Sequence, residues 1–371
     1  MTRINLYKII FLVCYWVFAA VFYVFFESTI LSYHSLSTNI IGLQYDLSRS
    51  VFVSVIVTII GGTAIGTFEV LYFNKLLRKQ PFGKTLIMKT TFYLLNIFIF
   101  TSIAIIVVAS VGYEKPIFHN VVLSSYIKYF SSQNFLLLMI YWSIAVMTGL
   151  FILQINDKLG KGVLINYMLG KYHDPKEEVR IFMFLDLKSS TAYAEEHGHL
   201  KYSQLIQDCF YDLTDVVIKR DASIYQYVGD EVVLTWDLEK GVKDNNCLNT
   251  FFDFDRVLKR KSDYYNETYK TIPEFKAGLH YGEAIITELG GVKKEIAYHG
   301  DTVNTTSRIQ ATCNELQKCL LVSADLLSIL HDKELDEKYT IESKGIAQLK
   351  GKKYVVGLFS VEENNAAMAS A

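Results

Sequence analysis

The chain has 371 residues, of which 51% are hydrophobic and 20% are charged, and its formal net charge is −1. This length allows two or three domains, and a positive mean hydropathy over so long a chain indicates membrane segments. The near-zero charge, without a basic run interleaved with aromatic residues, argues against a nucleic-acid partner. Five scattered cysteines lack a CxxC pair, which indicates reduced thiols rather than a disulfide framework or a zinc site.

Four apolar stretches occupy the amino-terminal half, at residues 6–26, 51–73, 90–111 and 135–153. Each approaches or exceeds the roughly 20 residues that a helix needs to cross a hydrocarbon core. The first is rich in aromatic residues and lacks a small-residue cleavage site, so we interpret it as a true span rather than a removable signal peptide. The sequence therefore predicts a four-span, multi-pass α-helical membrane domain over residues 1–155, in contact with lipid.

Basic residues near the span ends predict the orientation of this domain. They gather before the first span, between the second and third, and after the fourth, whereas the other two connections hold fewer. Such residues favour the cytoplasmic side, so both termini are predicted to be cytoplasmic. The residues concerned are Arg3, Lys8, Lys75, Arg78, Lys79, Lys84, Lys89, Lys158, Lys161 and Lys171.

Three residues of the second span invite a functional interpretation. Gly62 and Gly66 have the GxxxG spacing that lets helix backbones approach closely, which would suit a dimer contact, although such glycines are also common in membrane helices. Glu69 is an acidic residue inside a span, where a buried carboxylate would be a functional candidate. Because Glu69 lies close to the cytoplasmic end, we expect its side chain to reach water.

A polar, glycine-bearing linker is predicted over residues 156–178. Leu159, Val163 and Tyr167 fall at helical spacing, so a short amphipathic helix could continue inward from the fourth span. Gly160 and Gly162 weaken that helix. The segment is either a spacer or a signalling helix that pairs with its twin in a dimer.

The soluble half begins with a predicted buried strand at residues 179–187, which ends in Asp186. Lys188, Ser189, Ser190 and Thr191 then lead into a long helical pattern. Small hydroxyl residues can cap this helix, and its free N–H groups form an anion site. A carboxylate at a strand end beside a helix start is well placed for a metal that carries a phosphate.

Two strand-like runs at residues 223–236 flank Gly229 and Asp230, which predicts a tight hairpin with Asp230 near its tip. If the neighbouring strand is the one that bears Asp186, the two carboxylates converge. Hard oxygen ligands in that number suit Mg²⁺ or Mn²⁺, which leave positions open for substrate phosphates.

A further strand is predicted at residues 275–283, and residues 296–310 read as a short strand, a turn and a helix. On that helix Asn304 and Arg308 stand four apart and therefore share a face. Together they could orient a ribose and stabilise charge on a transferring phosphoryl group.

Five segments in this order, FLDLKSST, YQYVGDEVVLTW, KAGLHYGEA, HGDTVNTTSR and LKGKK, resemble the class III adenylate and guanylate cyclase catalytic domain. The resemblance covers residues 179–361 and leaves 362–371 as a flexible tail. It implies an α+β ferredoxin-like domain that makes a cyclic nucleotide and pyrophosphate. For a bacterial-type membrane cyclase, it also implies the cell inner membrane, with the catalytic domain on the cytoplasmic side.

The resemblance assigns roles to individual residues. Asp186 and Asp230 match the two metal-binding aspartates, with the backbone of Leu187 beside them, and two Mg²⁺ or Mn²⁺ ions are expected in each site. Asn304 matches the residue that positions the ribose, and Arg308 the one that stabilises the transition state. The phosphate contacts implied are Leu187, Lys188, Ser189, Ser190 and Thr191, together with Lys350 or Lys352.

In this family the catalytic sites lie between two domains, with the aspartates from one and the Asn–Arg pair from the other. One catalytic domain in the chain therefore implies a head-to-tail homodimer with two equivalent sites. The reaction implied is two-metal intramolecular phosphoryl transfer, in which the ribose 3′-hydroxyl attacks the α-phosphorus and pyrophosphate leaves.

The residues that select the purine base depart from the family pattern. Adenylate cyclases of this class usually carry Lys four residues before the second metal aspartate and guanylate cyclases carry Glu, whereas this chain has Gln226. The partner position falls on Ala297, which offers only backbone. The frequency of ATP specificity among bacterial-type membrane cyclases favours ATP, with GTP as the alternative.

Other functions stay open beside an active cyclase. A degenerate domain that only binds nucleotide would have lost a metal aspartate or the arginine, and neither is lost. A diguanylate cyclase shares the fold type, but its first turn glycine is missing here and the HGDTVNTTSR helix is foreign to that family. A transporter with a regulatory domain would show ion flux without cyclase activity.

Overall fold

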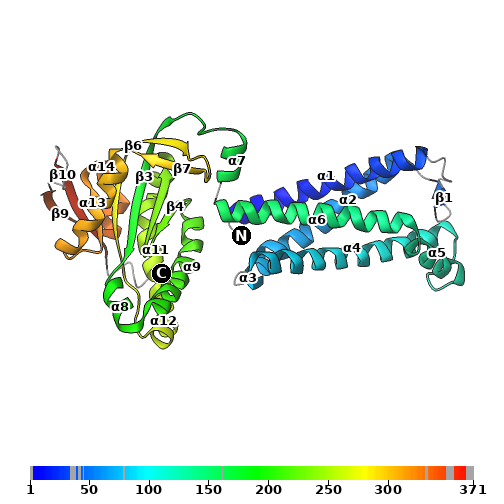
Figure 1. Ribbon diagram of the computed structural model, residues 1–371, viewed down its shortest axis with the longest axis horizontal. Helices are drawn as coiled ribbons and strands as arrows, with labels where there is room; N and C mark the ends of the chain where they lie inside the picture. The colour runs from blue at the N-terminus through cyan, green and yellow to red at the C-terminus, as the bar shows by residue number, and fades with distance from the viewer. Residues whose placement is uncertain are drawn as a thin grey trace. The chain divides into compact units, whose positions relative to one another are not determined.

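The computed structural model describes residues 3–33, 39–40, 43–44, 46–77, 80–160, 162–330, 333–347 and 355–364. The chain divides into two compact units, Met1–Leu159 and Gly160–Ala371. The first is helical apart from a pair of two-residue strands, and the second is built on a sheet (Figure 1).

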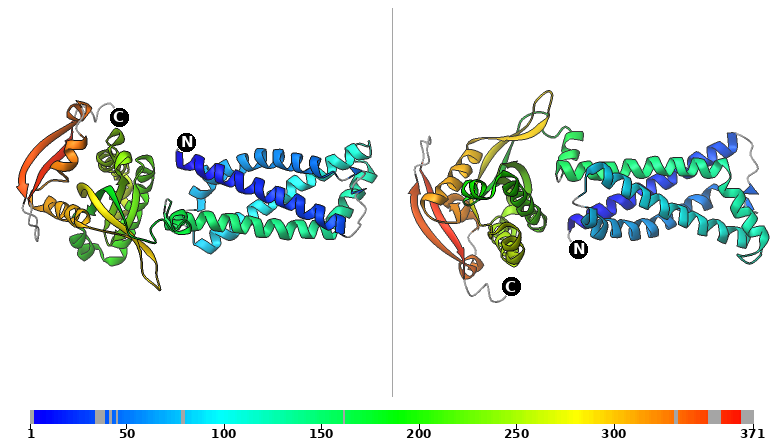
Figure 2. Two further views of the ribbon diagram at one scale, coloured as in Figure 1. Left: turned by 90° about the horizontal axis from the view of Figure 1, so that it is seen from above. Right: turned by 60° about the horizontal axis from the view of Figure 1, so that its bottom comes forward.

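The amino-terminal unit is a bundle of long helices that lie side by side (Figure 2). Within the described residues, four segments are long and apolar enough to cross a membrane: Leu6–Thr29, Leu47–Phe73, Phe82–Gly112 and Gln133–Leu159. Each contains most or all of one predicted apolar stretch. The elements are α1 (Arg3–Tyr33), β1 (Asn39–Ile40), β2 (Leu43–Gln44), α2 (Leu47–Phe68), a π-helical turn η1 (Glu69–Phe73), α3 (Asn74–Leu77), α4 (Phe82–Gly112), α5 (Asn120–Phe130) and α6 (Gln133–Leu159).

The GxxxG glycines of α2 serve a contact within the chain. A Cβ atom at Gly62 would lie 3.6 Å from Trp16 Cδ1, and one at Gly66 would lie 3.6 Å from Leu12 Cδ1, so both glycines face α1. Small residues at this spacing let α1 and α2 pack closely. These glycines therefore serve packing between two helices of one chain, rather than the dimer contact that the sequence suggested.

The expectation that Glu69 reaches water is wrong. Glu69 is 1% exposed and begins the π-helical turn η1, and its Oε1 lies 2.5 Å from the ammonium of Lys89 on α4, which is 3% exposed. A charge buried in an apolar bundle is costly unless it is paired, and Lys89 supplies the opposite charge. The other carboxylate oxygen, Oε2, is buried and has no hydrogen-bond partner among the described residues, and Glu69 lines a small cavity together with Gln154 and Asp157.

We expect Glu69→Gln to destabilise the helical bundle by about 3–5 kcal/mol, because it removes the carboxylate that balances a buried ammonium. The double variant Glu69→Gln/Lys89→Met should recover most of that loss. Lys8→Gln is the control, because the Lys8–Asp157 pair is partly exposed and such pairs contribute about 0–1 kcal/mol. Thermal unfolding of the full chain in nanodiscs measures all three, and equal effects of Glu69→Gln and Lys8→Gln would contradict this account.

The carboxy-terminal unit is a mixed eight-stranded sheet in the order β4-β5-β3-β6-β8-β10-β9, with β7 paired to an extension of β6. All its pairs are antiparallel except β6 with β8. The strands are β3 (Lys176–Leu187), β4 (Ser223–Val228), β5 (Glu231–Asp237), β6 (Phe275–Leu289), β7 (Glu295–His299), β8 (Leu320–Ser323), β9 (Tyr339–Ala347) and β10 (Val356–Glu363).

Helices cover both faces of this sheet. The chain order strand–helix–strand–strand–helix–strand from β3 to β6, with spatial order β4-β5-β3-β6, is the ferredoxin-like arrangement. The helical elements are α7 (Val163–Met168), α8 (Ser190–His197), α9 (His199–Lys219), α10 (Leu238–Val242), the 3₁₀ turn η2 (Lys243–Asn245), α11 (Asn246–Arg260), α12 (Ser262–Tyr269), α13 (Asp301–Glu315), α14 (Ala324–Leu330) and α15 (Lys333–Lys338).

Strand β3 is buried on both faces because its alternate residues serve two different cores. Ile181, Met183 and Leu185 pack in the large cluster with residues of α9 and α11. Phe182 and Phe184 belong to a smaller cluster on the other face, with Val303 of α13 against it. Figures 1 and 2 show α13 and the α9–α11 pair on opposite sides of the sheet. Since side chains alternate along a strand, Asp186 is expected on the α13 face.

The close packing of α13 on β6 requires a glycine. A Cβ atom at Gly278 would lie 2.3 Å from the backbone nitrogen of Gln310, so any side chain there would displace the helix. This approach fixes how near α13 stands to the end of β3.

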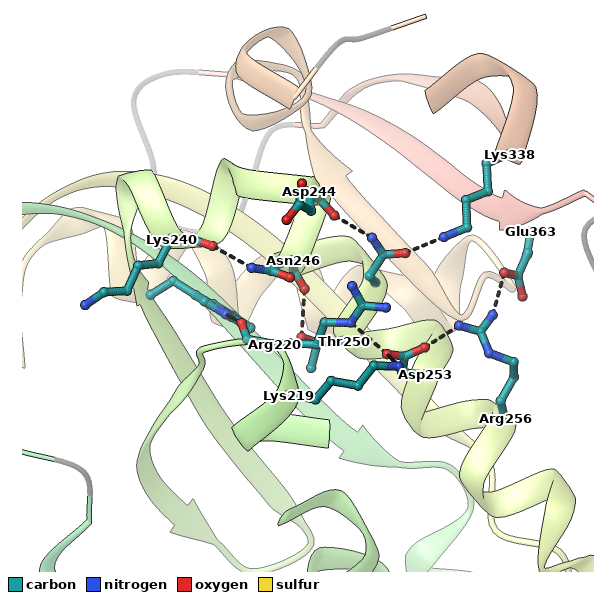
Figure 3. A network of polar contacts seen from close by, with 12 residues as sticks. Lys219, Arg220, Lys240, Asp244, Asn246, Thr250, Asp253, Arg256, Lys338 and Glu363 are labelled. Carbon is teal, nitrogen blue, oxygen red and sulfur yellow. Dashed lines mark hydrogen bonds and ion pairs between the residues drawn. The ribbon is translucent and has the colours of Figure 1, made fainter. Parts of the chain in front are cut away.

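Charges tie α9, α11 and β10 together at one edge of the α9–α11 layer (Figure 3). Buried Asp253 of α11 lies 2.7 Å from Arg220 Nε and 3.1 Å from Lys219 Nζ, and it also accepts from Arg256. Although burial alone would raise the pKa of Asp253, the hydrogen bonds from Arg220 and Arg256 hold it well below its usual range. Arg256 also binds Glu363 at the end of β10, at 2.5 Å.

Candidate active site

Two carboxylates lie at adjoining strand ends, where β3 and the β4–β5 hairpin meet. Asp186 stands opposite Glu231 in the β3–β5 register, and the Leu187 N–H donates to the Asp230 carbonyl at 3.4 Å. The strand that follows the Gly229–Asp230 turn is thus the direct neighbour of β3. The role of Asp186, Leu187 and Asp230 as metal ligands remains a prediction.

Asp186 is held by two side chains from different elements. Its Oδ2 lies 3.0 Å from Lys276 Nζ on β6 and accepts a hydrogen bond from Gln310 Nε2 on α13, also at 3.0 Å. Partial burial and the neighbouring charge of Asp230 raise the pKa of Asp186 above its ordinary value, against the opposing effect of Lys276. The ion pair with Lys276 therefore offsets only part of the cost of burying this carboxylate.

Lys276 and Gln310 were missed by reasoning from the sequence. Lys276 is buried, stands opposite Asp186 in the β3–β6 register, and also donates to Asn314 Oδ1 at 3.0 Å. Only the β3–β6 register shows that Lys276 stands opposite Asp186. In the sequence, a single Lys at the start of a predicted strand does not indicate a functional site. Gln310 could have been found as a polar residue at a buried position of the α13 pattern.

Glu231 adds a third acidic group beside Asp186 and Asp230, and these three residues are called the acidic corner below. Burial, together with the charges of Asp186 and Asp230, raises the pKa of Glu231 to about 7. Near neutral pH this side chain therefore exchanges its proton readily. Tyr202 of α9 also faces Asp230, and burial together with that carboxylate raises the pKa of the Tyr202 hydroxyl.

The predicted phosphate-binding residues form the turn between β3 and α8. Ser189 adopts a left-handed backbone conformation with φ of 55°, and α8 begins at the next residue. The Lys188 N–H donates to the Glu274 carbonyl at 2.9 Å, and its ammonium lies 3.3 Å from the Glu274 carboxylate. Ser189 and Thr191 are exposed and Ser190 is half-buried, so the turn is accessible to a ligand.

Asn304 and Arg308 lie on α13 and project away from Asp186. Asn304 is exposed and Arg308 is half-buried. Gln310, which contacts Asp186, is two residues beyond Arg308, and residues at that spacing do not share a helix face. Within the described residues, no hydrogen bond or ion pair joins Asn304 or Arg308 to the two aspartates. One subunit therefore keeps the two halves of the predicted site on different faces.

The two predicted base-selecting positions lie close to each other in the fold. Gln226 is exposed on β4, and Ala297 is 7% exposed on β7. The residues next to them, Tyr225 and Tyr298, are in ring contact at 4.7 Å. Lys350 and Lys352, the two predicted triphosphate contacts near the carboxyl terminus, lie outside the described residues.

The acidic corner fits a divalent cation shared with a phosphate. In the described part of the chain, no three or more His, Cys, Asp or Glu side chains form a closed metal site. Mg²⁺, however, is usually bound through one or two carboxylates, with waters and substrate phosphates completing its shell. Burial, together with the neighbouring carboxylates, raises the pKa values of Asp186 and Glu231, and a divalent cation at this corner would stabilise their charged forms.

The acidic corner predicts a pH-dependent stability. The pKa of Glu231 lies near 7 in the folded chain and near 4.5 when unfolded, so the unfolded chain releases this proton first. In EDTA, the free energy of unfolding of the sheet should therefore fall as pH rises from 4.5 to 7. The raised pKa of Asp186 also makes the free energy of unfolding fall as pH rises.

Glu231→Gln should make this dependence shallower without abolishing it, and added Mg²⁺ should do the same for the parent chain. The measurement is the denaturant concentration at which β3 and β5 are half unfolded in the full chain, and pulse-labelling hydrogen exchange of their backbone amides reports it. A Glu231→Gln variant with the parent's pH slope would contradict the assignment.

Comparisons with known proteins converge on one family. The model of the adenylate and guanylate cyclase catalytic domain matches residues 171–361. Adenylate cyclase 2 of Rhizobium meliloti (strain 1021) is 36% identical over 178 residues, which are 48% of this chain and 49% of that protein. Adenylate cyclase 1 of the same organism is 23% identical over 185 residues, 48% of this chain and 27% of that protein.

The solved structures add a likeness of fold. A bacterial light-regulated adenylyl cyclase superposes with a TM-score of 0.53 at 18% identity, and the match covers 63% of this chain and 67% of that one. This chain spans about half the length of Adenylate cyclase 2 and about a quarter of Adenylate cyclase 1. The family model, at residues 171–361, falls within the sheet-containing unit.

Proposed function

Because this chain belongs to the family of adenylate and guanylate cyclase catalytic domains, we propose that it is a membrane-anchored adenylate cyclase. It converts ATP to cyclic AMP and pyrophosphate, with its catalytic unit on the cytoplasmic side of the cell inner membrane. The observation that carries the proposal is the meeting of Asp186, Asp230 and Lys276 at one end of β3, beside the turn that opens α8.

The choice of ATP rests on relatives rather than on base-contacting residues. Both Rhizobium proteins are named adenylate cyclases, and one of them shares 36% identity with this chain. Gln226 offers both a donor and an acceptor, so its amide suits the edge of either purine. Cyclic GMP formation from GTP is accordingly the second candidate.

Domains of this family generally use divalent metal ions. Asp186 and Asp230, with the Leu187 carbonyl, would hold two Mg²⁺ or Mn²⁺ ions, and the ion pair with Lys276 would restrict the movement of the Asp186 carboxylate. When bound, such ions supply activation of the ribose 3′-hydroxyl and neutralisation of the triphosphate.

The chain's own residues perform the remaining tasks. Backbone N–H groups of Ser189, Ser190 and Thr191, where the turn opens α8, bind phosphate oxygens, as a helix amino terminus does. Asn304 orients the ribose so that its 3′-oxygen lies in line with the α-phosphorus. Arg308 stabilises the negative charge that builds up there as the 3′-oxygen–phosphorus bond forms and the bond to pyrophosphate breaks.

The arrangement on α13 supports a homodimer with shared sites. Asn304 and Arg308 project away from the aspartates of their own subunit, so they would serve the aspartates of a twin. A head-to-tail pair then contains two equivalent sites. Anchoring both chains in one membrane raises their effective concentration and favours the pair.

We expect Asp230→Ala and Arg308→Ala each to lower cyclic AMP production by about a hundredfold or more, since each removes charge aimed at the transition state. The assay uses the full chain in nanodiscs with ATP and either Mg²⁺ or Mn²⁺, with GTP in a parallel arm. Arg260→Ala and Asp263→Ala are matched controls. Arg260 is the last residue of α11 and Asp263 lies in α12, and both side chains are exposed.

The controls should keep the parent rate. Equal product from the parent chain and from Asp230→Ala and Arg308→Ala would show that this site does not carry the activity. Product from GTP alone would keep the cyclase assignment and replace ATP as the substrate.

A further inference from the structure

An aromatic contact links the two strands that carry the base-selecting positions. The rings of Tyr225 on β4 and Tyr298 on β7 meet edge to face, with centroids 4.7 Å apart. The Tyr298 N–H also donates to the Tyr225 hydroxyl at 3.4 Å. Tyr225 directly precedes Gln226 in the chain, and Tyr298 directly follows Ala297. The contact therefore joins the backbones that present these two positions.

A buried arginine packs against one of the two tyrosine rings. The Arg180 guanidinium on β3 lies 5.4 Å from the centre of the Tyr298 ring and is 6% exposed. It is fixed by ion pairs to Asp237 at 2.7 Å and Glu178 at 3.1 Å. A cation held over an aromatic face is attracted by the ring's quadrupole, more strongly where water is excluded. Tyr298 is thereby confined on the side that faces β3.

A bulge in β4 gives Tyr225 its influence over Gln226. The β4–β5 register shifts between Ile224 and Gln226, so Tyr225 is the extra residue and Gln226 pairs with Val233. Val233 belongs to the cluster on the α13 face, which puts Gln226 on that face too. A bulge re-aims the side chain that follows it, and this bulge is anchored by the Tyr225 ring.

Only one of the two predicted base-selecting positions, Gln226, carries a polar side chain. The side chain of Ala297 is a methyl group, so of these two side chains only that of Gln226 can hydrogen-bond the variable edge of a purine. The amide suits adenine in one orientation and guanine in the other, because its donor and acceptor exchange places. Discrimination thus requires that Gln226 be held in one orientation.

We propose that Tyr225 and Tyr298, braced by Arg180, are positioning residues that orient Gln226 and so set the choice between ATP and GTP. This inference rests on the proposed cyclase function. Loosening the tyrosine contact lets the backbone that carries Gln226 shift relative to the one that carries Ala297, so the amide can meet either purine edge, which moves the selectivity ratio toward one. The size expected is about tenfold, that of one hydrogen bond to the base.

The test compares Tyr298→Leu, which removes the ring, with Tyr298→Phe, which keeps it. Full-length chain in nanodiscs is assayed for kcat and KM with ATP and with GTP, and for Kd with a non-cyclisable analogue of each. Tyr298→Leu should shift the ATP-to-GTP ratio of kcat/KM by about tenfold, mainly through KM, while Tyr298→Phe stays near the parent. Tyr264→Leu, a partly exposed tyrosine of α12, is the matched control.

Two gentler variants keep the test decisive if Tyr298→Leu folds poorly. Tyr225→Phe removes only the hydroxyl that accepts the Tyr298 N–H, and Arg180→Lys removes the planar guanidinium over the ring. Both should shift the ratio in the same direction by a smaller factor.

The outcomes separate this inference from the proposed function. An unchanged ratio with both nucleotides weakened equally would mean a merely structural role and overturn the inference while the cyclase stands. If the parent binds both analogues without turnover, the cyclase proposal fails and the Kd ratio decides the inference. If the parent binds neither analogue, both are overturned.

Discussion

Strand β3 pairs with β5 along one side and with β6 along the other, and this register sets Asp186 opposite both Glu231 and Lys276. A slip of one residue would turn Asp186 into the apolar layer under α9 and α11 and expose the neighbouring leucines on the α13 face. Ile181, Met183 and Leu185 fill one core and the larger Phe182 and Phe184 the other, so a slip would also exchange side chains of different size between two packed cores. Hydrophobic burial thus places the acidic corner.

Charge is distributed unevenly between the two units. In the helical bundle, Glu69 and Lys89 neutralise each other out of contact with water, and their main effect is on packing. In the sheet, Lys276 pairs with Asp186, while Asp230 and Glu231 lie nearby and the pKa of Glu231 is raised. The first arrangement balances its own charge. The second gains stability when a divalent cation brings the opposite charge to it.

The sequence predicted the elements whose signal is local. Four long apolar stretches gave four long helices, and the Gly229–Asp230 turn gave a hairpin beside β3. Contacts between distant segments were not predictable in this way. Glu69 was expected at water because its partner lies on another helix, and Lys276 was overlooked because its value depends on the β3–β6 register. The roles of Asn304 and Arg308 came from resemblance, since neither touches the aspartates in one chain.

Cross-complementation of two inactive variants tests the shared site most directly. Asp230→Ala and Arg308→Ala chains, mixed at random in one membrane, should recover about a quarter of the parent activity, because half of the dimers hold one intact site of two. A mixture of Asp186→Asn with Asp230→Ala should stay inactive, since both changes fall in the same half of every site. No recovery in the first mixture, or equal recovery in both, would contradict a site built from the aspartates of one subunit and the α13 face of another.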